Sequence, residues 1–410
     1  MKVTIPLPPH ALTVLTLLES AGFCAYAVGG CVRDSLLGRE PLDWDIATSA
    51  RPEEAMRALE GLRLIETGLQ HGTVTALVGG RAVEVTSFRL DGDYSDHRRP
   101  DTVTFTDDLC ADLSRRDFTV NAMAWHPARG LRDPFGGKDD LRAKLLRCVG
   151  APERRFGEDA LRILRALRFY AVLGFTLEEN TARAVLELRG NLHHIAVERL
   201  REELLKLLGG AYAGPVLEDY RAVIFTILPQ LARLEGEPWR RCRAAVEALR
   251  PDPALRMAAL LRPLGEEIAR DILNQLRCSR AFTERVAKLV RMRCTAPAAA
   301  PQAIAAAATR RLLGEYGEAA LLDCLDMTRA EGGITSAECA ALQAEVRALR
   351  SACVTRKQLA VNGTDLAALG LKGPELGLAL EALLEDVLEG RAENEREALL
   401  ARAAAARVRL

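Results

Sequence analysis

The sequence predicts an α+β head of about 140 residues followed by a remainder built of helices. Short alternating or β-branched runs are concentrated in the first third, at 25–28, 73–78 and 82–88, and such runs are typical of strands. From residue 141 onward, Leu, Ala, Arg and Glu recur at helical spacing, which is typical of amphipathic helices. At 410 residues, the chain is long enough for about two to four domains.

The head is predicted to hold a small mixed or antiparallel sheet with helices. Gly79 and Gly80 separate the second and third strands, which indicates a hairpin and antiparallel neighbours. The stretches 10–22 and 51–61 carry apolar residues at helical spacing and end at or beside glycine, so we expect helices there.

The helical remainder is predicted to divide into three parts. The low-complexity stretch 294–309 contains Pro297 and Pro301, which would break a continuous helix. We therefore place a domain boundary there, and the predicted division of the whole chain is 1–140, 141–208, 209–295 and 296–410.

The composition is that of a globular protein without a membrane segment. The 56 Lys and Arg residues balance 56 Asp and Glu residues, and 49% of residues are hydrophobic, which excludes a disordered acidic or basic chain. No apolar stretch approaches the roughly 20 residues that a membrane-spanning helix needs, and a secretion signal is lacking. Ten cysteines without a CxxC indicate neither a zinc site nor a disulfide framework. We expect a cytoplasmic location and no membrane partner.

The segment AVGGCVRDSLLGREPLDWDIAT at 27–48 is the most informative part of the chain. A strand is predicted to end at Gly29 and Gly30, where the lack of side chains lets the backbone approach phosphate oxygens. The helix that follows offers free N–H groups, and Arg33 adds a forked cation. By itself, a pair of glycines is only a turn.

The next predicted strand carries two carboxylates, Asp43 and Asp45, on one face, with Trp44 on the other. Paired carboxylates suit Mg²⁺, a hard ion that prefers oxygen ligands. Glu84 lies mid-strand among apolar residues, where an unpaired carboxylate would be costly. It either pairs with a nearby arginine or completes a two-metal site with the two aspartates, and we favour the second interpretation.

These ordered motifs, with others along the chain, resemble those of the class II tRNA nucleotidyltransferases, the bacterial CCA-adding enzymes of the DNA polymerase β-like superfamily. The resemblance covers nearly the whole chain. It rests on GGxxRD with DxD, TGLQHGTVT (67–75), DLSRRDFTVNAMA (112–124), GEDALRILRALRF (157–169), ERLREELLKLL (198–208) and the tail segment 359–390.

The resemblance implies a catalytic head, a base-recognising neck at 141–208, and a body and tail that bind tRNA. It implies that Arg116 holds phosphate and that Asp117 reads the ribose hydroxyl. Asn121 falls four residues after Asp117, on the same face of the helix predicted there. The alternative interpretation is an aspartate near a helix N-terminus with arginines on the surface.

In GEDALRILRALRF, Asp159 and Arg162 are three residues apart, so both can point at one flat ligand from a helix. A carboxylate that accepts from an amino group beside a guanidinium that donates to a ring nitrogen would accept cytosine and adenine and reject uracil and guanine. Alternatively, Glu158 pairs with Arg162 on the surface. The resemblance implies that Arg165 and Arg168 help to hold the nucleotide, although such arginines also occur on solvated faces.

The polar segment 90–105 resembles the family's flexible loop, which is implicated in switching from CTP to ATP, and its Arg98 and Arg99 could approach triphosphate or RNA. His71 and His97 have no assigned role. The last of the six histidines is His194, so an HD-type phosphohydrolase domain is not predicted in the helical remainder.

The predicted reaction is attack of the tRNA 3′-hydroxyl on the α-phosphorus of CTP or ATP, with two Mg²⁺ ions held by the three acids and pyrophosphate as the leaving group. The alternatives are a CC-adding or A-adding enzyme, a bacterial poly(A) polymerase, and a catalytically silent RNA-binding protein. We expect tRNA to contact surface cations such as Arg356 and Lys357. Monomer and homodimer are left open.

Overall fold

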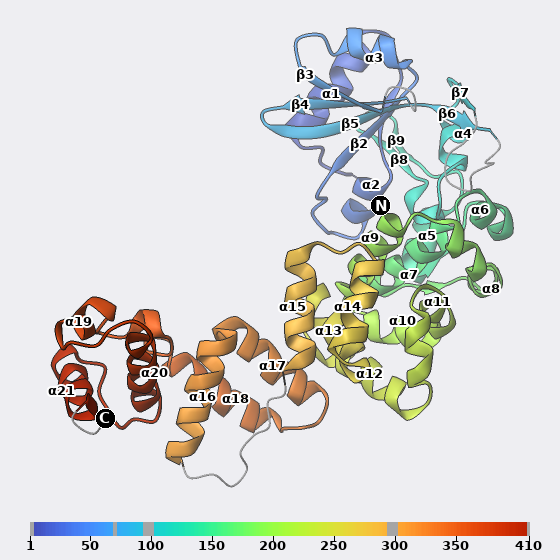
Figure 1. Cartoon of the computed structure of the whole chain (residues 1–410). Coiled ribbons are helices and arrows are strands. Elements are labelled where there is room, and N and C mark those ends of the chain that lie inside the picture. Colours follow the sequence, from blue (N-terminus) through green and yellow to red (C-terminus); the bar gives the residue numbers. More distant parts are fainter. Residues whose placement is uncertain (1–3, 69–71, 93–101, 293–301, 408–410) are drawn as a thin grey trace. The chain divides into compact units, whose positions relative to one another are not determined.

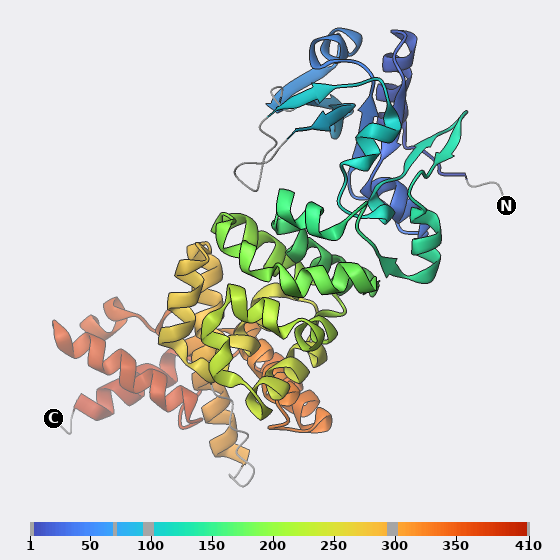
Figure 2. The ribbon, with the colours of Figure 1, turned by 90° about the vertical axis from the view of Figure 1, so that its right-hand side faces the viewer.

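The computed structural model describes residues 4–68, 72–92, 102–292 and 302–407. Its contacts divide the chain into two compact units, Met1–Arg233 and Leu234–Leu410. The change from strands to helices along the chain is visible in both views of the ribbon (Figures 1 and 2), and it confirms the predicted fold class. Within the described ranges, no helix is long and apolar enough to span a membrane. The finer division into four domains stays a prediction.

A seven-stranded mixed sheet forms the centre of the first unit, in the order β3-β4-β5-β2-β1-β8-β9. Only β2 and β5 run parallel within it, and the other neighbours are antiparallel. Val78 pairs with Arg81 across the Gly79-Gly80 turn, which confirms the predicted hairpin. The strands of the sheet are β1 (Ala25–Val28), β2 (Trp44–Thr48), β3 (Arg63–Gly68), β4 (Thr73–Val78), β5 (Arg81–Ser87), β8 (Ala124–His126) and β9 (Gly130–Arg132).

Helices and a second hairpin accompany this sheet. In Figure 1, α1 and α3 lie together on one side of it, and both contact its strands. Leu113 of α4 packs in one buried cluster with Tyr26 and Ala47 of the sheet. Because side chains alternate along a strand, Asp45 lies on the same face as Ala47. These elements are α1 (Pro9–Ser20), α2 (Gly30–Leu36), α3 (Pro52–Ala58), α4 (Leu109–Ser114), the 3₁₀ helix η2 (Thr119–Asn121), and the antiparallel pair β6 (Arg89–Asp91) and β7 (Val103–Phe105).

The rest of the first unit is helical except for one short parallel pair of strands, β10 (Leu145–Leu146) and β11 (Thr176–Leu177). Helices α7 and α9 pack against each other along their length, and the α7 side chains Ile163, Leu164 and Leu167 are fully buried. The helices are α5 (Gly137–Ala143), α6 (Pro152–Glu158), α7 (Leu161–Leu173), α8 (Glu179–Glu187), η3 (Arg189–His194), α9 (Val197–Leu208), α10 (Ala213–Asp219), α11 (Arg221–Ile227) and η4 (Pro229–Leu234).

Two helix predictions for this unit were wrong. Residues 115–124 were expected to lead into an apolar helix, but after the short 3₁₀ helix η2 they enter strand β8. The segment 157–169 was expected to form one helix, but it is divided between α6 and α7. Asp159, with φ −141° and ψ 102°, is extended, and its side chain accepts a hydrogen bond from the backbone N–H of Leu161 at 3.0 Å. This local bond competes with continuation of the helix.

The second unit is helical throughout its described part. Every side chain of α13 from Ala254 to Leu261 is buried, and Leu366, Leu383 and Leu399 form part of a separate cluster near the C-terminus. The proposed boundary at Pro297 and Pro301 lies outside the described residues. The helices are α12 (Glu237–Ala248), α13 (Pro253–Leu261), η5 (Arg262–Leu264), α14 (Glu266–Gln275), α15 (Arg280–Arg291), α16 (Gln302–Tyr316), α17 (Glu318–Ala330), α18 (Ser336–Ala348), η6 (Arg356–Gln358), α19 (Gly363–Ala368), α20 (Pro374–Leu388) and α21 (Arg396–Arg407).

The crossing of α7 with the end of α9 depends on a glycine, which gives a test of the packing. A Cβ on Gly210 would lie 2.8 Å from Cβ of Ala171 and closer still to its carbonyl group. Gly210→Ala should therefore lower the free energy of unfolding by about 1–3 kcal/mol, as overpacking does. Urea denaturation measures this loss. The control is Gly190→Ala, where a Cβ meets nothing within 4 Å; equal stability of the two variants would contradict the close packing.

Candidate active site

The parallel pairing of β2 with β5 brings two of the predicted carboxylates together. Asp45 and Glu84 are direct partners in the register. Asp43 lies one residue before β2 and is exposed, whereas Trp44 is buried. Glu84 is also exposed, so the argument that its carboxylate is buried among apolar residues was wrong. Its apolar sequence neighbours Val83 and Val85 point into the core, and Glu84 points away from it.

The three acids interact electrostatically. Partial burial, together with the negative charges of Glu84 and Asp43, raises the pKa of Asp45 to about 6, and the charge of Arg116 opposes this rise. In the described part of the chain, however, no three His, Cys, Asp or Glu side chains converge closely enough to form a ready-made metal site. Carboxylate oxygens of this kind fit a hard divalent cation, but the structure does not place the three side chains around one common point.

Gly29 lies where no side chain would fit. Its φ is 77°, and a Cβ at this position would lie 2.8 Å from Nη1 of Arg116 and 3.9 Å from Oδ2 of Asp45. The same residue precedes α2, whose first residue is Gly30. The structure thus brings three predicted groups close together: the turn and the arginine that are predicted to bind phosphate, and one predicted metal ligand, Asp45.

Arg116 is held by a carboxylate on one side and faces the Gly29 turn on the other. Its Nη2 lies 3.5 Å from Oδ2 of Asp112, a carboxylate that is 1% exposed. Asp112 also accepts from Nε of Arg115 at 2.9 Å and from the backbone N–H of Arg89 at 3.3 Å. The Nε group of Arg116 is buried without a hydrogen-bond partner among the described residues. An unsatisfied donor of this kind suits an anionic ligand.

A chain of hydrogen bonds links α2 to α7 through Asp117 and Asn121. Arg33 donates to both carboxylate oxygens of Asp34, at 2.8 and 2.9 Å, and to Oδ1 of Asn121 at 2.7 Å. Asn121 donates to Oδ1 of Asp117 at 3.0 Å. Asp117 also accepts from the backbone of Phe118 and twice from Arg165. The predicted proximity of Asn121 to Asp117 is found, although by way of a 3₁₀ turn.

The carboxylate of Asp117 is ionised, and both of its oxygens accept hydrogen bonds. Burial by itself raises the pKa of this carboxyl, but the charge of Arg165 and the hydrogen bonds from Asn121 and Arg165 bring the pKa well below its ordinary value. Its two oxygens accept four hydrogen bonds, which is about the capacity of a carboxylate. A ribose hydroxyl would therefore have to replace one of the present donors.

The arginines of α7 do not form a plain solvated face. Arg162 is 8% exposed, and Nε of Arg168 lies 3.2 Å from the buried Glu203 of α9. The guanidinium carbons of Arg168, Arg33 and Arg165 lie 4.1, 5.1 and 5.7 Å from the ring centre of Phe169. Three cations therefore surround one aromatic ring, each within cation–π range.

The predicted base-reading pair is engaged with other protein groups. Oδ2 of Asp159 accepts from Arg199 of α9 at 2.8 Å. Arg162 donates to Glu158 at 2.8 Å and to the backbone carbonyls of Arg155 and Arg115, both at 3.3 Å. The alternative contact between Glu158 and Arg162 is thus formed, but both side chains are largely buried rather than on the surface.

Three protein families match consecutive parts of the chain. The poly A polymerase head domain matches residues 25–147, the probable RNA and SrmB-binding site of polymerase A matches residues 174–233, and the putative tRNA nucleotidyltransferase domain 2 matches residues 254–403. The first match contains the acids, Gly29 and Arg116.

Curated relatives cover nearly the whole chain. The CCA-adding enzyme of Geobacillus stearothermophilus is 37% identical over 412 residues, 96% of each chain. The chain belongs to the class II CCA-adding enzymes. The CCA-adding enzyme of Geobacillus thermodenitrificans is 38% identical over 405 residues, also 96% of each chain. The sequence resemblance to this family of nucleotidyltransferases is therefore confirmed.

Solved structures of CCA-adding enzymes match the fold. That of Bacillus stearothermophilus in complex with CTP has a TM-score of 0.78 and 34% identity, and the match covers 98% of this chain and 99% of that one. The Thermotoga maritima CCA-adding enzyme complexed with tRNA_CCA has a TM-score of 0.64 and covers 98% and 96%, but at 23% identity it supports the fold alone.

Four residues singled out in the sequence, His71, His97, Arg98 and Arg99, lie outside the described residues, as does most of the 90–105 loop.

Two residues that hold predicted site residues in place were not themselves predicted from the sequence. Asp112 precedes Arg116 by four residues within the quoted motif, so the spacing alone signals a pair. Arg199 is 40 residues from Asp159, and no local pattern links the two.

The close approach of Gly29 to Arg116 can be tested directly. Gly29→Ala places a methyl group against the guanidinium in a backbone conformation that L-residues rarely adopt. We expect KM for the nucleotide to rise and nucleotide addition by this CCA-adding enzyme to fall by at least about tenfold, because Arg116 is displaced. Steady-state kinetics measures both. Gly22→Ala, which has φ 92° but no atom within 4 Å of its Cβ, controls for backbone strain. Equal activity of the two variants would contradict the role of the close approach.

Proposed function

We propose that the enzyme adds C, C and A in turn to the 3′ end of tRNA, using CTP and ATP and releasing pyrophosphate. The supporting observation is the grouping of a glycine turn, an arginine with an unsatisfied donor and paired carboxylates at Gly29, Arg116, Asp45 and Glu84. The CCA-adding enzyme of Geobacillus stearothermophilus matches over 96% of this chain, and the solved CCA-adding enzyme of Bacillus stearothermophilus is in complex with CTP.

Asp43, Asp45 and Glu84 would hold the Mg²⁺ ions of this reaction. Bound there, two divalent cations would supply Lewis acidity to the attacking hydroxyl and neutralise charge on the triphosphate. Burial and then the negative charges of Glu84 and Asp43 raise the pKa of Asp45, and a positive charge between these side chains would relieve the repulsion.

The phosphates would be bound and oriented by the groups around Gly29. The turn has no side chain in the way, and the terminal nitrogen Nη1 of Arg116 faces it. Asp112 keeps this guanidinium in place. Arg33 is held by its hydrogen bonds to Asp34 and Asn121. Its proposed role is to fix the shape of the Gly29 turn and to add positive charge there. A direct phosphate contact would cost it a bond to Asp34.

The base would be chosen by Asp159 and Arg162. For Asp159 to accept from the amino group of cytosine or adenine, the base must compete with Arg199 for the carboxylate. Arg162 is anchored by Glu158, which leaves other donors of its guanidinium for a ring nitrogen. Arg165 and Arg168 hold the ribose-reading Asp117 and the neck in position through their ion pairs.

Purified protein with three RNA acceptors tests the function. A tRNA ending at the discriminator base should receive CCA from CTP and ATP, and a tRNA ending in CC should receive only A. An oligo(A) primer should not be extended. Extension of oligo(A) would indicate a poly(A) polymerase, and addition of CC only or A only would indicate a half-specialised enzyme. No addition to any acceptor with Mg²⁺ present would contradict an enzymatic function.

The role of Glu84 gives a sharper test. Glu84→Gln keeps the size of the side chain but removes one of the charges that act on Asp45, so kcat should fall by about 100-fold or more. The matched control is Glu66→Gln, another exposed glutamate on a strand of the same sheet, and its kcat should be unchanged. Single-turnover addition of one C measures this. Equal rates for the two variants would exclude Glu84 from the catalytic site.

The base-reading assignment predicts a change in selectivity. In Asp159→Ala, the preference for CTP and ATP over UTP and GTP should fall by about tenfold or more, as expected for loss of a specific hydrogen-bond pair. Arg199→Ala removes the present partner of Asp159 and should keep the preference. Competition between labelled nucleotides measures the ratio. If both variants lose selectivity equally, the contact between the two residues acts structurally and Asp159 does not read the base.

A further inference from the structure

The aromatic ring of Phe169 lies beside three cations that come from two separate segments. Arg33 belongs to α2, whereas Arg165 and Arg168 belong to α7, as does the ring itself. Their guanidinium carbons lie 5.1, 5.7 and 4.1 Å from the ring centre, in that order. The ring is 7% exposed, and cation–π contacts become stronger when they are shielded from water.

Each of these guanidinium groups also has a carboxylate of its own. The ion pairs are Arg33 with Asp34 at 2.8 Å, Arg165 with Asp117 at 2.5 Å and Arg168 with Glu203 at 3.2 Å. The three carboxylates belong to different segments, namely α2, the residues before η2, and α9. The ion pairs therefore orient each cation separately, whereas the ring of Phe169 is contacted by all three cations.

The three like charges repel one another at this spacing. Burial, then the charge of Arg165 and, more weakly, that of Arg33 lower the pKa of Arg168, while nearby carboxylates oppose this decrease. The face of an aromatic ring is electron-rich and attracts guanidinium groups. Phe169 therefore compensates part of the repulsion without adding a net charge, which an aliphatic side chain of similar size would not do.

The ring is also packed against the segment that carries Asp117. Phe118 and Phe169 are in edge-to-face contact, with ring centres 5.7 Å apart and an angle of 84° between the rings, and Phe118 is fully buried. This arrangement is favourable for two aromatic rings. The backbone N–H of Phe118 donates to Asp117 at 2.8 Å. Phe169 thus contacts both the residue next to Asp117 and the arginine that pairs with Asp117.

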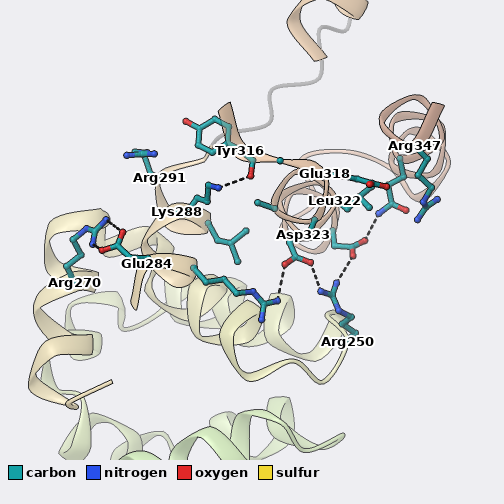
Figure 3. A pocket seen from close by; sticks show the side chains of 17 residues that line it. Arg250, Arg270, Glu284, Lys288, Arg291, Tyr316, Glu318, Leu322, Asp323 and Arg347 are labelled. Carbon is teal, nitrogen blue, oxygen red and sulfur yellow. Dashed lines mark hydrogen bonds and ion pairs between the residues drawn. The ribbon is translucent and has the colours of Figure 1, made fainter. Parts of the chain in front are cut away.

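A second ring with two neighbouring cations lies in the second unit and provides a comparison. In the pocket shown in Figure 3, Lys288 and Arg291 lie beside Tyr316, each 5.7 Å from its ring centre. This ring is less buried than that of Phe169, and none of the three residues is among the proposed catalytic or nucleotide-binding groups. Tyr316 is therefore a control for the loss of an aromatic ring beside cations.

We propose that Phe169 is a positioning residue for nucleotide binding, whose ring face keeps the three guanidinium groups together against their mutual repulsion. Through Arg165 it fixes the carboxylate of Asp117. Through Arg33, whose backbone N–H donates to the carbonyl of Gly29 at 3.1 Å, it fixes the glycine turn. The proposal rests on the proposed function, because the nucleotide at these groups would be CTP or ATP. Phe169 itself needs no contact with the nucleotide.

Fluorinated rings at position 169 of the full-length enzyme separate this role from packing. Fluorine withdraws electron density from the ring face but leaves its shape almost unchanged, so cation–π attraction weakens while packing is kept. With one and then three fluorine atoms on Phe169, the KM for CTP should rise stepwise, to about fivefold or more. The KM for tRNA should stay unchanged. Phe169→Leu, which removes the ring face, should raise the KM for CTP at least as much.

The control is Tyr316→Leu, which should leave the KM for CTP unchanged at saturating tRNA. A wild-type KM for CTP in both fluorinated enzymes would overturn the proposal, and so would an equal rise in Tyr316→Leu. Thermal melting shows whether each variant is folded, and the fluorinated rings decide the matter if Phe169→Leu does not fold. Failure of the proposed function is distinguishable, because the unmodified enzyme would then add no C to tRNA. Calorimetric Kd values for CTP would still compare the rings.

Discussion

The proposed nucleotide site of the first unit depends on one buried carboxylate, that of Asp117. Asp117 accepts hydrogen bonds from Asn121 and Arg165, and Asn121 in turn accepts from Arg33. An isolated charge at such depth would be strongly unfavourable, and the cost of removing one partner of a buried pair is several kcal/mol. Because its donors come from different segments, the ionised state of Asp117 ties the turn at Gly29 to helix α7. Among the proposed nucleotide-binding groups, Arg33 and Arg165 are positioned directly by that connection.

A second constraint comes from the order of the strands. β2 and β5 are parallel neighbours, so after β2 the chain crosses over through α3 to the edge strand β3 and comes back across the sheet through β4 to β5. This crossover places Asp45 and Glu84 opposite each other, although they are far apart in the sequence. The repulsion between the two is compensated in part by Arg116, which Asp112 holds in place. The fold thus concentrates negative charge at one point and positive charge beside it.

The sequence predicted the elements with regular periodicity and failed where side chains interrupt it. The strand at 73–78 was placed correctly because its alternation reflects one covered face, and the strand at 25–28 was placed correctly although it is buried on both faces. Asp159 was misplaced in a helix, since periodicity cannot detect its local bond to Leu161. The exposure of Glu84, by contrast, was foreseeable, because the apolar Val83 and Val85 on either side of it face the core and alternation turns Glu84 the other way. The contact of Asp159 with Arg199 depends on tertiary packing of α7 with α9.

The ring of Phe169 in α7 has a consequence for the charges around the proposed nucleotide site. Guanidinium groups of Arg33, Arg165 and Arg168 share its surroundings, so like charges are kept in fixed positions around a neutral spacer instead of on long mobile arms. Little conformational entropy is left to lose when a triphosphate or an RNA end arrives. The three guanidinium groups around Phe169 are therefore preorganised, because folding places them before any ligand binds.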